Sequence, residues 1–411
     1  MRRVAVTGLG VVSPLGHSAA LAFAAARAGR SAIGRLDMGG VERLATPLGA
    51  AVTGFNGADH FDSPRLRMLD RCSQFALVAA SQALADARPE PTAAEHGRTG
   101  VFVGTGMGGI GSIDDGYRTL YGENSDRIKP FTILLGMHNA PAAWIAGAHG
   151  LLGPSLSYST ACSSSAVSIG EAWLRLSRGE LDLAVAGGTE APLALGSLKA
   201  WEALRTVAAI DRADPQASCK PFSKNRSGMV LGEGAAMLVL EPWDRAVARG
   251  AFIHGELAGY GLCTDTGHIT RPSVEGQAAA LRSALRSARM DAAQVDAINA
   301  HGTGTPANDG VETAAIRAVF GARADRIPVS ATKAMHGHLL GASSALECVL
   351  SLLAMQHGVA LPTMHLAQPD PECDLDYVPN VARAGLAVRA MLSSSFAFGG
   401  TNAVLALKAA D

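Results

Sequence analysis

Short strand-like segments with few polar residues constrain the fold of this chain more than any other feature. A strand without polar alternation is buried on both faces, and helical patterns separate most of these segments. This succession predicts an α/β fold in which helices cover both faces of a mostly parallel sheet. The strand-like segments are 4–7, 101–104, 155–159, 183–187 and 235–240, and the helical patterns are 19–27, 63–87, 132–147 and 166–178.

The same kind of succession begins again after Arg249 and Gly250. No Pro- or Ser-rich linker separates the two parts, so we expect them to pack into one body. We therefore predict two similar halves, residues 1–250 and 251–411. In the second half the strand-like segments are 253–261, 297–300, a short one from 329, 390–394 and 403–408, and the helical patterns are 276–288, 309–320 and 339–357.

Charge and cysteine usage restrict the partners and the location. The chain has 35 Lys and Arg against 36 Asp and Glu, so a net charge of -1 gives no reason to expect nucleic acid as a partner. Six cysteines are scattered without a CxxC pair, which is typical of free thiols in a reducing cytoplasm. The sequence begins with a strand pattern, and no apolar run reaches the ~18 residues of a membrane span. We therefore expect a cytoplasmic protein without a membrane partner.

One cysteine occupies a position that suits a nucleophile. The strand-like segment 155–159 leads into a turn of small residues that contains Cys162, and a helical pattern begins at 166. The unpaired backbone N–H groups at a helix N-terminus favour a thiolate, so the sulfur is expected to be a better nucleophile than an ordinary thiol. On position alone, a buried and inert cysteine is an equally good interpretation.

Three further motifs lie where a strand ends or a helix begins. The carboxyl ends of parallel strands line the ligand crevice of α/β folds. We therefore expect the side chains of these motifs to converge on Cys162, although they are far apart in the sequence. The motifs are 299–306 with His301, 330–338 with Lys333 and His338, and 395–402 with Phe398.

Together and in this order, the motifs closely resemble those of the β-ketoacyl-acyl carrier protein synthases, the elongating ketosynthases of the thiolase superfamily. The resemblance covers essentially the whole chain, including the segments 220–224 and 228–235. It implies a thiolase fold, a five-layer α-β-α-β-α sandwich built from two similar halves. It also implies decarboxylative Claisen condensation of an acyl group with malonyl-acyl carrier protein, in fatty acid or polyketide elongation. The run 199–205 further resembles the nodulation-type and aryl-polyene-type branch.

The resemblance implies a role for each catalytic position. Cys162 would carry the acyl group, and its backbone N–H would form an oxyanion hole together with that of Phe398. His301 and His338 would donate hydrogen bonds to the enolate that forms when malonyl thioester loses CO₂.

Two charged residues match further catalytic positions of the family. Lys333 and Glu347 are expected to form an ion pair that fixes His338 and the nearby helix. Direct proton transfer by this pair is the less favoured interpretation.

Other positions are expected to bind the substrate. Met107 would be a movable side chain in the wall of the acyl pocket, and Thr132 would widen or lengthen the acyl channel. These departures, with Trp201, favour a polyene or an unusual acyl chain as the substrate. The positions expected along the phosphopantetheine arm are Thr303 and Thr305, with Thr270 as a further substrate-binding residue.

The resemblance also implies the partners. No cofactor is expected apart from the phosphopantetheine that arrives on acyl carrier protein. The chain is expected to form a homodimer, or a heterodimer with a chain-length factor. A subunit that is active only in such a heterodimer, or that is largely a scaffold, remains an alternative. Arg65, Arg67 and Arg71 are candidates for docking the carrier protein, and an ordinary solvated face is the alternative for them.

Other classes of protein fit the sequence less well. His336 and His338 do not belong to a zinc-site spacing, so no metal is expected. The segment 104–109 fits GxGxxG but lacks the acidic residue of a dinucleotide site. A thiolase would need a second reactive cysteine in the turn 398–400, which carries none. An initiating synthase would have Asn in place of His338, and a chain-length factor would lack Cys162.

Overall fold

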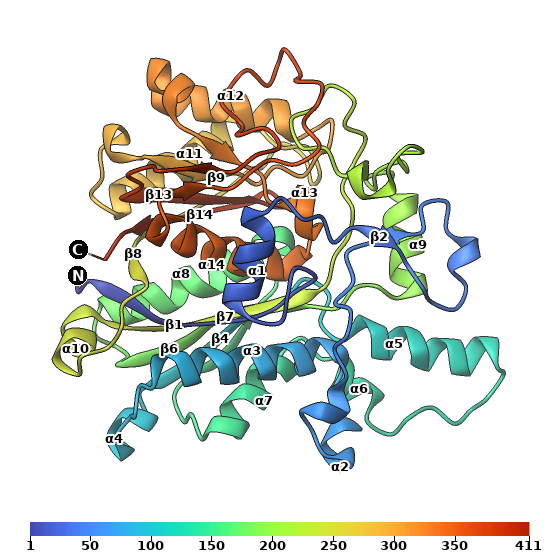
Figure 1. Ribbon diagram of the computed structural model, residues 1–411. Helices are drawn as coiled ribbons and strands as arrows, with labels where there is room; N and C mark the ends of the chain where they lie inside the picture. Colours follow the sequence, from blue (N-terminus) through green and yellow to red (C-terminus); the bar gives the residue numbers. More distant parts are fainter. Residues whose placement is uncertain (411) are drawn as a thin grey trace.

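One mixed sheet that repeats a five-strand pattern forms the framework of the molecule (Figure 1). The structure is a computed structural model that describes residues 1–410. Within these residues ten strands lie side by side in the order β10 (Val329–Ser330), β9 (Ala297–Asn299), β13 (Ala390–Phe396), β14 (Thr401–Lys408), β8 (Gly255–Thr264), β1 (Val4–Val12), β7 (Gly234–Pro242), β6 (Leu183–Glu190), β4 (Thr99–Gly104) and β5 (Ser155–Tyr158).

The two sets of five strands share one topology. Counted from the outer edge, each set has two parallel pairs followed by two antiparallel pairs, and the first strand of each set in the sequence lies at the centre. A short antiparallel pairing joins the sets, in which Val4 to Val6 of β1 face Leu257 to Gly255 of β8. The strand order therefore repeats within the chain.

Helices lie between the two sets of strands and also cover their outer faces (Figure 1). Two of them pack against each other in the middle of the molecule, two cover the first set and two cover the second. The layers follow the order α-β-α-β-α, as the resemblance implied. The helices of these layers are α8 (Ser164–Ser177) and α14 (Ser343–Gln356) in the middle, α3 (Arg71–Ala87) and α7 (Ala140–His149) on one side, and α11 (Val274–Ser287) and α12 (Asp309–Phe320) on the other.

Shorter elements complete the described chain. The remaining helices are α1 (Ala19–Arg27), α2 (Ser63–Leu66), α4 (Ala93–His96), α5 (Ile110–Tyr117), α6 (Thr132–Gly136), α9 (Leu195–Ala203), α10 (Trp243–Ala248) and α13 (Lys333–His336). Two small antiparallel sheets pair β2 (Gly34–Arg35) with β3 (Leu48–Gly49) and β11 (Val359–Ala360) with β12 (Arg383–Ala384). Among residues 1–410, no helix combines the length and the apolar character needed to cross a membrane.

The prediction of a mostly parallel sheet is wrong. Of the strand pairs in the large sheet of residues 1–410, those that involve β1, β7, β8 and β14 are antiparallel. Helices cover both faces here, so antiparallel strands are as apolar as parallel ones, and the apolar pattern does not reveal their direction.

Two long helices of the prediction are each broken in the structure. The expected helix 63–87 is α2 followed by α3, because the Asp70 side chain accepts the Cys72 N–H and begins a new helix. The expected helix 132–147 is α6 followed by α7, since Met137 adopts an extended conformation between them.

Two glycines allow α3 to pack directly on β1. A Cβ atom at Gly10 would lie 1.9 Å from the carbonyl oxygen of Ala79, and one at Gly8 would lie 2.1 Å from that of Ala83. The strand expected from the sequence covered residues 4–7, so both glycines were expected to lie outside it. Gly8 and Gly10 instead lie inside β1, where their lack of a side chain permits the close approach of the helix.

Candidate active site

Cys162 lies in a tight turn between β5 and α8. The turn is a single 3₁₀ segment, Ala161–Ser163, and α8 begins at the next residue. Ala161 has a φ of 51°, a left-handed conformation that costs an alanine about 1 kcal/mol or more. This strained turn presents Cys162 at the N-terminal end of a buried helix, as the sequence predicted.

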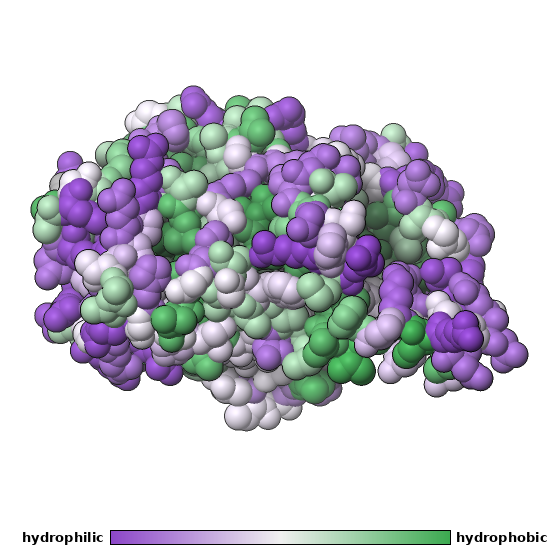
Figure 2. All heavy atoms as spheres, turned by 90° about the horizontal axis from the view of Figure 1, so that it is seen from below, coloured by the Kyte–Doolittle hydropathy of each residue, from purple (hydrophilic) through white to green (hydrophobic). Residues whose placement is uncertain are grey.

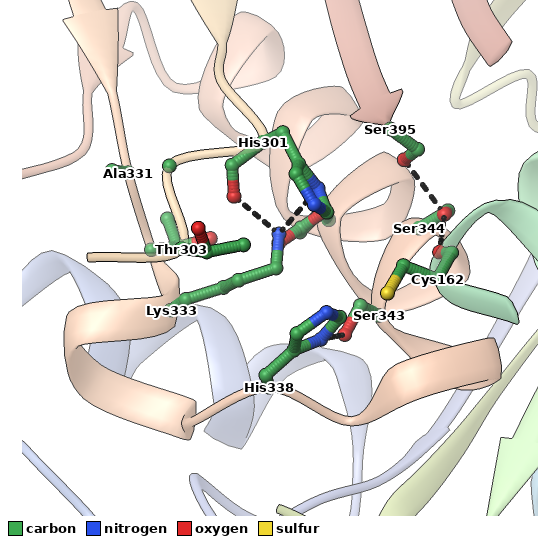
Figure 3. A network of polar contacts seen from close by, with 12 residues as sticks. Cys162, His301, Thr303, Ala331, Lys333, His338, Ser343, Ser344 and Ser395 are labelled. Atoms are coloured by element: carbon green, nitrogen blue, oxygen red, sulfur yellow. Dashed lines mark hydrogen bonds and ion pairs between the residues drawn. The ribbon is translucent and has the colours of Figure 1, made fainter. Parts of the chain in front are cut away.

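Two histidines from the second half of the chain meet this sulfur (Figure 3). The reactive atoms of Cys162, His301 and His338 all lie within 4.8 Å of one another, and the two imidazole rings are 5.5 Å apart and nearly perpendicular. Figure 3 shows the sulfur directed toward both rings. His301 follows the end of β9, and His338 lies in the segment between α13 and α14. The structure therefore brings together the three residues that the motifs placed far apart.

A cavity of about 220 Å³ opens at these residues. The cysteine and both histidines are buried at its base. Thr303 and Thr305 line the same cavity, and their hydroxyl oxygens are 2.8 Å apart. The lining also contains two further expected substrate residues, Thr270 and Phe398.

Two backbone N–H groups lie against the sulfur. Those of Cys162 and Phe398 face it and oppose the rise of the thiol pKa. Gly399 and Gly400 follow with φ of 81° and 80°, which a residue with a side chain rarely adopts. The turn therefore brings the Phe398 N–H to the position expected for an oxyanion hole.

Hydrogen bonds fix which nitrogen of His338 carries the proton. The Leu340 N–H donates to Nδ1 at 3.2 Å, and the Ser343 hydroxyl lies 2.8 Å from the same atom. Nδ1 is therefore an acceptor, and the neutral ring has its proton on Nε2. Nε2 has no partner among residues 1–410. Burial, with the charge of Lys333, holds the pKa of His338 well below its ordinary value, so the ring is neutral.

Lys333 fixes the other histidine. Its ammonium group donates to the carbonyl oxygen of His301 at 2.6 Å and to Oε1 of Glu347 at 2.5 Å, and it lies 3.4 Å from Nδ1 of His301. An ammonium group only donates, so Nδ1 accepts and Nε2 of His301 also carries the proton. Burial, with Lys333, lowers the pKa of His301 well below its ordinary value.

The expected ion pair between Lys333 and Glu347 is present, but it does not fix His338. Within the described residues, no hydrogen bond joins Lys333 to His338. Lys333 instead reaches His301, because α13 directly follows β10 and β10 pairs with β9. The ring of His338 is positioned by the Ser343 hydroxyl and by the Leu340 N–H.

The expectation of a thiolate at Cys162 is wrong for the resting site. Burial raises the pKa of the thiol to about 11, against the opposing effects of Lys333 and of the two backbone N–H groups. The side chain is only 5% exposed, and desolvation outweighs the charges around it. The sulfur is therefore a thiol at neutral pH and must lose its proton during the reaction.

A thiol and two imidazoles are also donors that zinc accepts. The hydrogen bonds to Nδ1 place the protons of His301 and His338 on Nε2, the nitrogen without a partner at His338. A protonated nitrogen is not a metal ligand, and the thiol would have to ionise as well. The arrangement suits hydrogen-bond donation better than metal binding.

Three expected substrate residues lie outside the cavity lining. Trp201 stacks on Phe398, with ring centroids 6.2 Å apart, and Met107 packs in a neighbouring apolar cluster. Thr132 is buried, and its methyl group faces Gly116 of α5. The structure therefore places Trp201 beside the site and Thr132 away from this cavity.

The basic residues proposed for docking differ in their environment. Arg71 forms an ion pair with Glu233 at 2.7 Å, so its charge is already neutralised. Arg65 stacks over Phe61 and Trp144, and Arg67 is exposed.

Several residues that support the site were missed in the sequence. Ser344 donates to the carbonyl oxygen of Cys162 and contacts the hydroxyl of Ser395, and Glu312 accepts the N–H groups of His301 and Gly302. Glu190 accepts three backbone N–H groups around the active-site turns, and burial raises its pKa to about 7. The pair Ser343 and Ser344, which opens a helix just after the His338 motif, was a signal that could have been read.

The thiol can accept an acyl group as a thioester, and the two imidazole donors beside it suit a condensation of that acyl group in the same cavity. Two family descriptions match the chain: Beta-ketoacyl synthase, N-terminal domain, over residues 1–246, and Beta-ketoacyl synthase, C-terminal domain, over residues 254–367. The chain belongs to the β-ketoacyl synthase family and is a condensing enzyme.

Full-length relatives agree with this assignment. Nodulation protein E of Rhizobium meliloti (strain 1021) is 43% identical over 408 residues, which cover 99% of both chains. The 3-oxoacyl-[acyl-carrier-protein] synthase 2 of Staphylococcus aureus (strain COL) is 37% identical over 409 residues, 99% of this chain and 98% of the other. The solved structure of the ishigamide ketosynthase/chain length factor superposes with a TM-score of 0.92 at 33% identity and covers 100% of both chains. The fold is the thiolase fold of these ketosynthases.

Proposed function

We propose that this enzyme elongates acyl chains on acyl carrier protein by decarboxylative condensation at Cys162. The observation that carries the proposal is the meeting of one thiol with two neutral Nε2–H donors at the base of one cavity. In the first step the sulfur attacks the acyl thioester, the tetrahedral oxygen accepts from the N–H groups of Cys162 and Phe398, and the carrier leaves as a free thiol. The Cys162 proton passes to that leaving sulfur.

The second step needs donors for an enolate. Malonyl thioester loses CO₂, and the electron pair of the broken bond forms an enolate whose oxygen accepts from Nε2–H of His301 and His338. Both rings are neutral and keep these protons, so they act as hydrogen-bond donors. The enolate carbon then attacks the acyl carbonyl, the Cys162 sulfur leaves, and the thiolate takes up a proton.

The proposed partner is acyl carrier protein, which brings the phosphopantetheine arm as the sole prosthetic group. The name of the Staphylococcus aureus relative includes this carrier, and the threonines at the cavity suit an amide-rich arm. All six cysteines within residues 1–410 are free, which supports a location in a reducing cytoplasm. We place the division between the two halves at residue 250, since the strand order repeats after it.

A second chain is proposed to pack on the edge of the sheet at β5. Within the described residues, β5 has a neighbour on one side alone, and such an edge can pair with another chain. Figure 2 shows the underside of the molecule, where hydrophobic atoms gather between hydrophilic ones. Exposed apolar side chains on or near β5 and α6 include Ile133, Leu134, Leu152 and Leu156. The partner is a second copy or a chain-length factor.

Trp201 supports the proposal of an unusual acyl substrate. Its ring lies against Phe398, which lines the cavity next to the sulfur. A large aromatic pair at this position favours flat, conjugated acyl chains over saturated ones. Equal turnover of saturated and polyunsaturated acyl carriers by the purified enzyme would argue against this choice of substrate.

Substitutions at the three reactive residues test the proposed chemistry. Cys162→Ala should abolish the acyl-enzyme, which intact mass spectrometry detects, and Cys162→Gln should release CO₂ from malonyl-carrier without condensation. His301→Ala and His338→Ala should lower decarboxylation by about 10²–10³-fold and acylation much less. Condensation that persists after either change at Cys162 would contradict the assignment.

A subunit that works only in a heterodimer is the second candidate. The similar ishigamide structure contains a ketosynthase and a chain length factor, and this observation supports the heterodimer as a second candidate. Purified protein alone, mixed with acyl-carrier substrates, should become acylated at Cys162 if it acts as a homodimer. Acylation that requires a second, different chain would instead establish the heterodimer.

A further inference from the structure

The loop between β8 and α11 forms part of the mouth of the cavity. Asp265 accepts from the Ser273 hydroxyl at 2.6 Å and from the Asn402 amide at 3.1 Å. The Ile269 carbonyl accepts the Gly399 N–H at 2.8 Å. These bonds hold the loop against the turn that carries the oxyanion donor, so its side chains have a defined position relative to the cysteine.

Arg271 is an uncommitted cation in this loop. Its side chain is exposed and also lines the cavity, and it makes no hydrogen bond or ion pair with any residue of the described chain. Among the described residues that line the cavity, it is the sole Lys or Arg. The one carboxylate in the same lining, Asp265, is already occupied by Ser273 and Asn402. Arg271 is therefore free to bind an anion that arrives at the mouth.

We infer that Arg271 binds the phosphate at the outer end of the phosphopantetheine arm. The inference rests on the proposed function, because that function brings the arm into this cavity. A cavity of about 220 Å³ admits the arm and excludes a folded carrier protein. The phosphodiester that joins the two must then remain where the cavity opens, and Arg271 lies there.

The chemistry of the side chain fits this ligand. A guanidinium group presents parallel N–H donors that match two phosphate oxygens, and it stays charged at every working pH. Thr303 and Thr305 lie deeper on the same cavity wall, beside the buried histidine, and suit the amide part of the arm. The arm would thus be held at two points, with its thioester at Cys162.

The test compares two small thioesters that differ by the phosphate alone. The rate of Cys162 acylation is measured by intact mass spectrometry with hexanoyl-4′-phosphopantetheine and with hexanoyl-pantetheine. Arg271→Gln should lower the second-order rate constant about tenfold for the phosphorylated thioester and change it less than twofold for the other. Arg271→Lys should recover part of the loss, since it restores the charge without the two-pronged geometry.

A matched control removes the same charge elsewhere. Arg286 is exposed at the far end of α11 and does not line the cavity, so Arg286→Gln should leave both rates unchanged. If Arg271→Gln lowers the acylation rate constants of both thioesters by the same factor, the inference is overturned. The same rate is also measured with hexanoyl-acyl carrier protein. If Arg271→Gln lowers the rate with this substrate alone, the inference is overturned, because Arg271 would then contact the protein surface of the carrier. If the unaltered enzyme is acylated neither by hexanoyl- nor by conjugated hexadienoyl-acyl carrier protein, the proposed function itself fails.

Discussion

Burial shifts the pKa of the thiol and the pKa of the two imidazoles in the proposed active site in opposite directions. It raises the pKa of Cys162 to about 11, because a buried thiolate loses its hydration. It lowers the pKa of His301 and His338, because a buried imidazolium loses its hydration too. The resting site therefore holds three uncharged groups beside the Lys333–Glu347 pair. Uncharged donors are what a developing enolate needs, whereas the nucleophile needs activation during the reaction.

The protonation state of Cys162 gives the first prediction. With a pKa of about 11, the thiolate fraction rises about tenfold for each pH unit below that value, so alkylation by iodoacetamide should accelerate without a plateau from pH 7 to 9. Peptide mass mapping measures the rate at Cys162 separately from the other five cysteines. A plateau within this range would show a thiol of much lower pKa, and Cys162→Ala serves as the blank.

Ser343 is a positioning residue for His338. Its hydroxyl lies 2.8 Å from Nδ1, and Ser343→Ala removes that contact while Leu340 still fixes the proton on Nε2. We expect CO₂ release from malonyl-carrier, measured in the Cys162→Gln background, to fall about tenfold, in line with one buried hydrogen bond.

Two comparisons separate this role from a general loss of structure. Ser343→Ala with Cys162 present should leave the acylation rate within twofold, and Ser343→Thr should restore decarboxylation. Ser344→Ala should lower the acylation rate and leave decarboxylation nearly unchanged, since the Ser344 hydroxyl contacts the Cys162 carbonyl. A parallel loss of both activities in Ser343→Ala would exclude a specific role at His338.

Among the elements, β1 and α3 illustrate packing that depends on backbone contact. α3 lies on β1 with its carbonyl oxygens against the two glycines of the strand, and no side chain separates them. Asp86 and Gln82 of α3 also accept the N–H groups of Leu9 and Val11. These bonds satisfy strand groups that lie beyond the short pairing with β8, which ends at Val6. The helix thus completes the hydrogen bonding of the strand that it covers.

Because of this contact, one added methyl group at Gly10 is expected to lower the stability of the protein strongly. Gly10→Ala would place a Cβ 1.9 Å from the Ala79 oxygen, so the helix must move, and the free energy of unfolding should fall by about 1–3 kcal/mol or more. Urea unfolding followed by circular dichroism measures the change.

A glycine in α7 provides the matched control. A Cβ at Gly147 meets nothing within 4 Å, and Gly147 is exposed. Gly147→Ala should therefore raise the free energy of unfolding by about 0.5–1 kcal/mol through helix propensity. If Gly10→Ala and Gly147→Ala change the free energy of unfolding by the same amount and sign, the contact between β1 and α3 does not explain the glycine at position 10.

At the scale of the whole molecule, the central helices join the two halves. Every residue of α14 except Gln356 is buried, and the helix packs against α8 and against strands of both sets. The proposed active site is assembled across this layer, because Cys162 comes from the first half and both histidines from the second. Neither half alone contains a complete site.

This arrangement predicts that the two halves unfold together. All four tryptophans, at 144, 173, 201 and 243, lie in residues 1–250, so their fluorescence reports the first half alone. Leu346→Ala, in the second half, removes a fully buried side chain and should lower the free energy of unfolding by about 2–5 kcal/mol. Urea transitions followed by fluorescence and by circular dichroism should shift equally.

An exposed leucine gives the comparison. Leu21 is 57% exposed on α1, so Leu21→Ala should change stability by less than about 0.5 kcal/mol. If Leu346→Ala shifts the circular dichroism transition but not the fluorescence transition, the halves are independent in folding.

The sequence by itself determined the succession of strands and helices, the position of Cys162 at the start of α8 and the order of the motifs that identify the family. These features reside in neighbouring residues, in hydrophobic periodicity and in short runs around the reactive groups. The tertiary structure decided the direction of the strands, the pairing of Lys333 with His301, the proton position on each imidazole and the protonation of Cys162. Each of these depends on contacts with residues far away in the chain and on the desolvation that those residues cause. A local pattern of side chains contains no information about such residues.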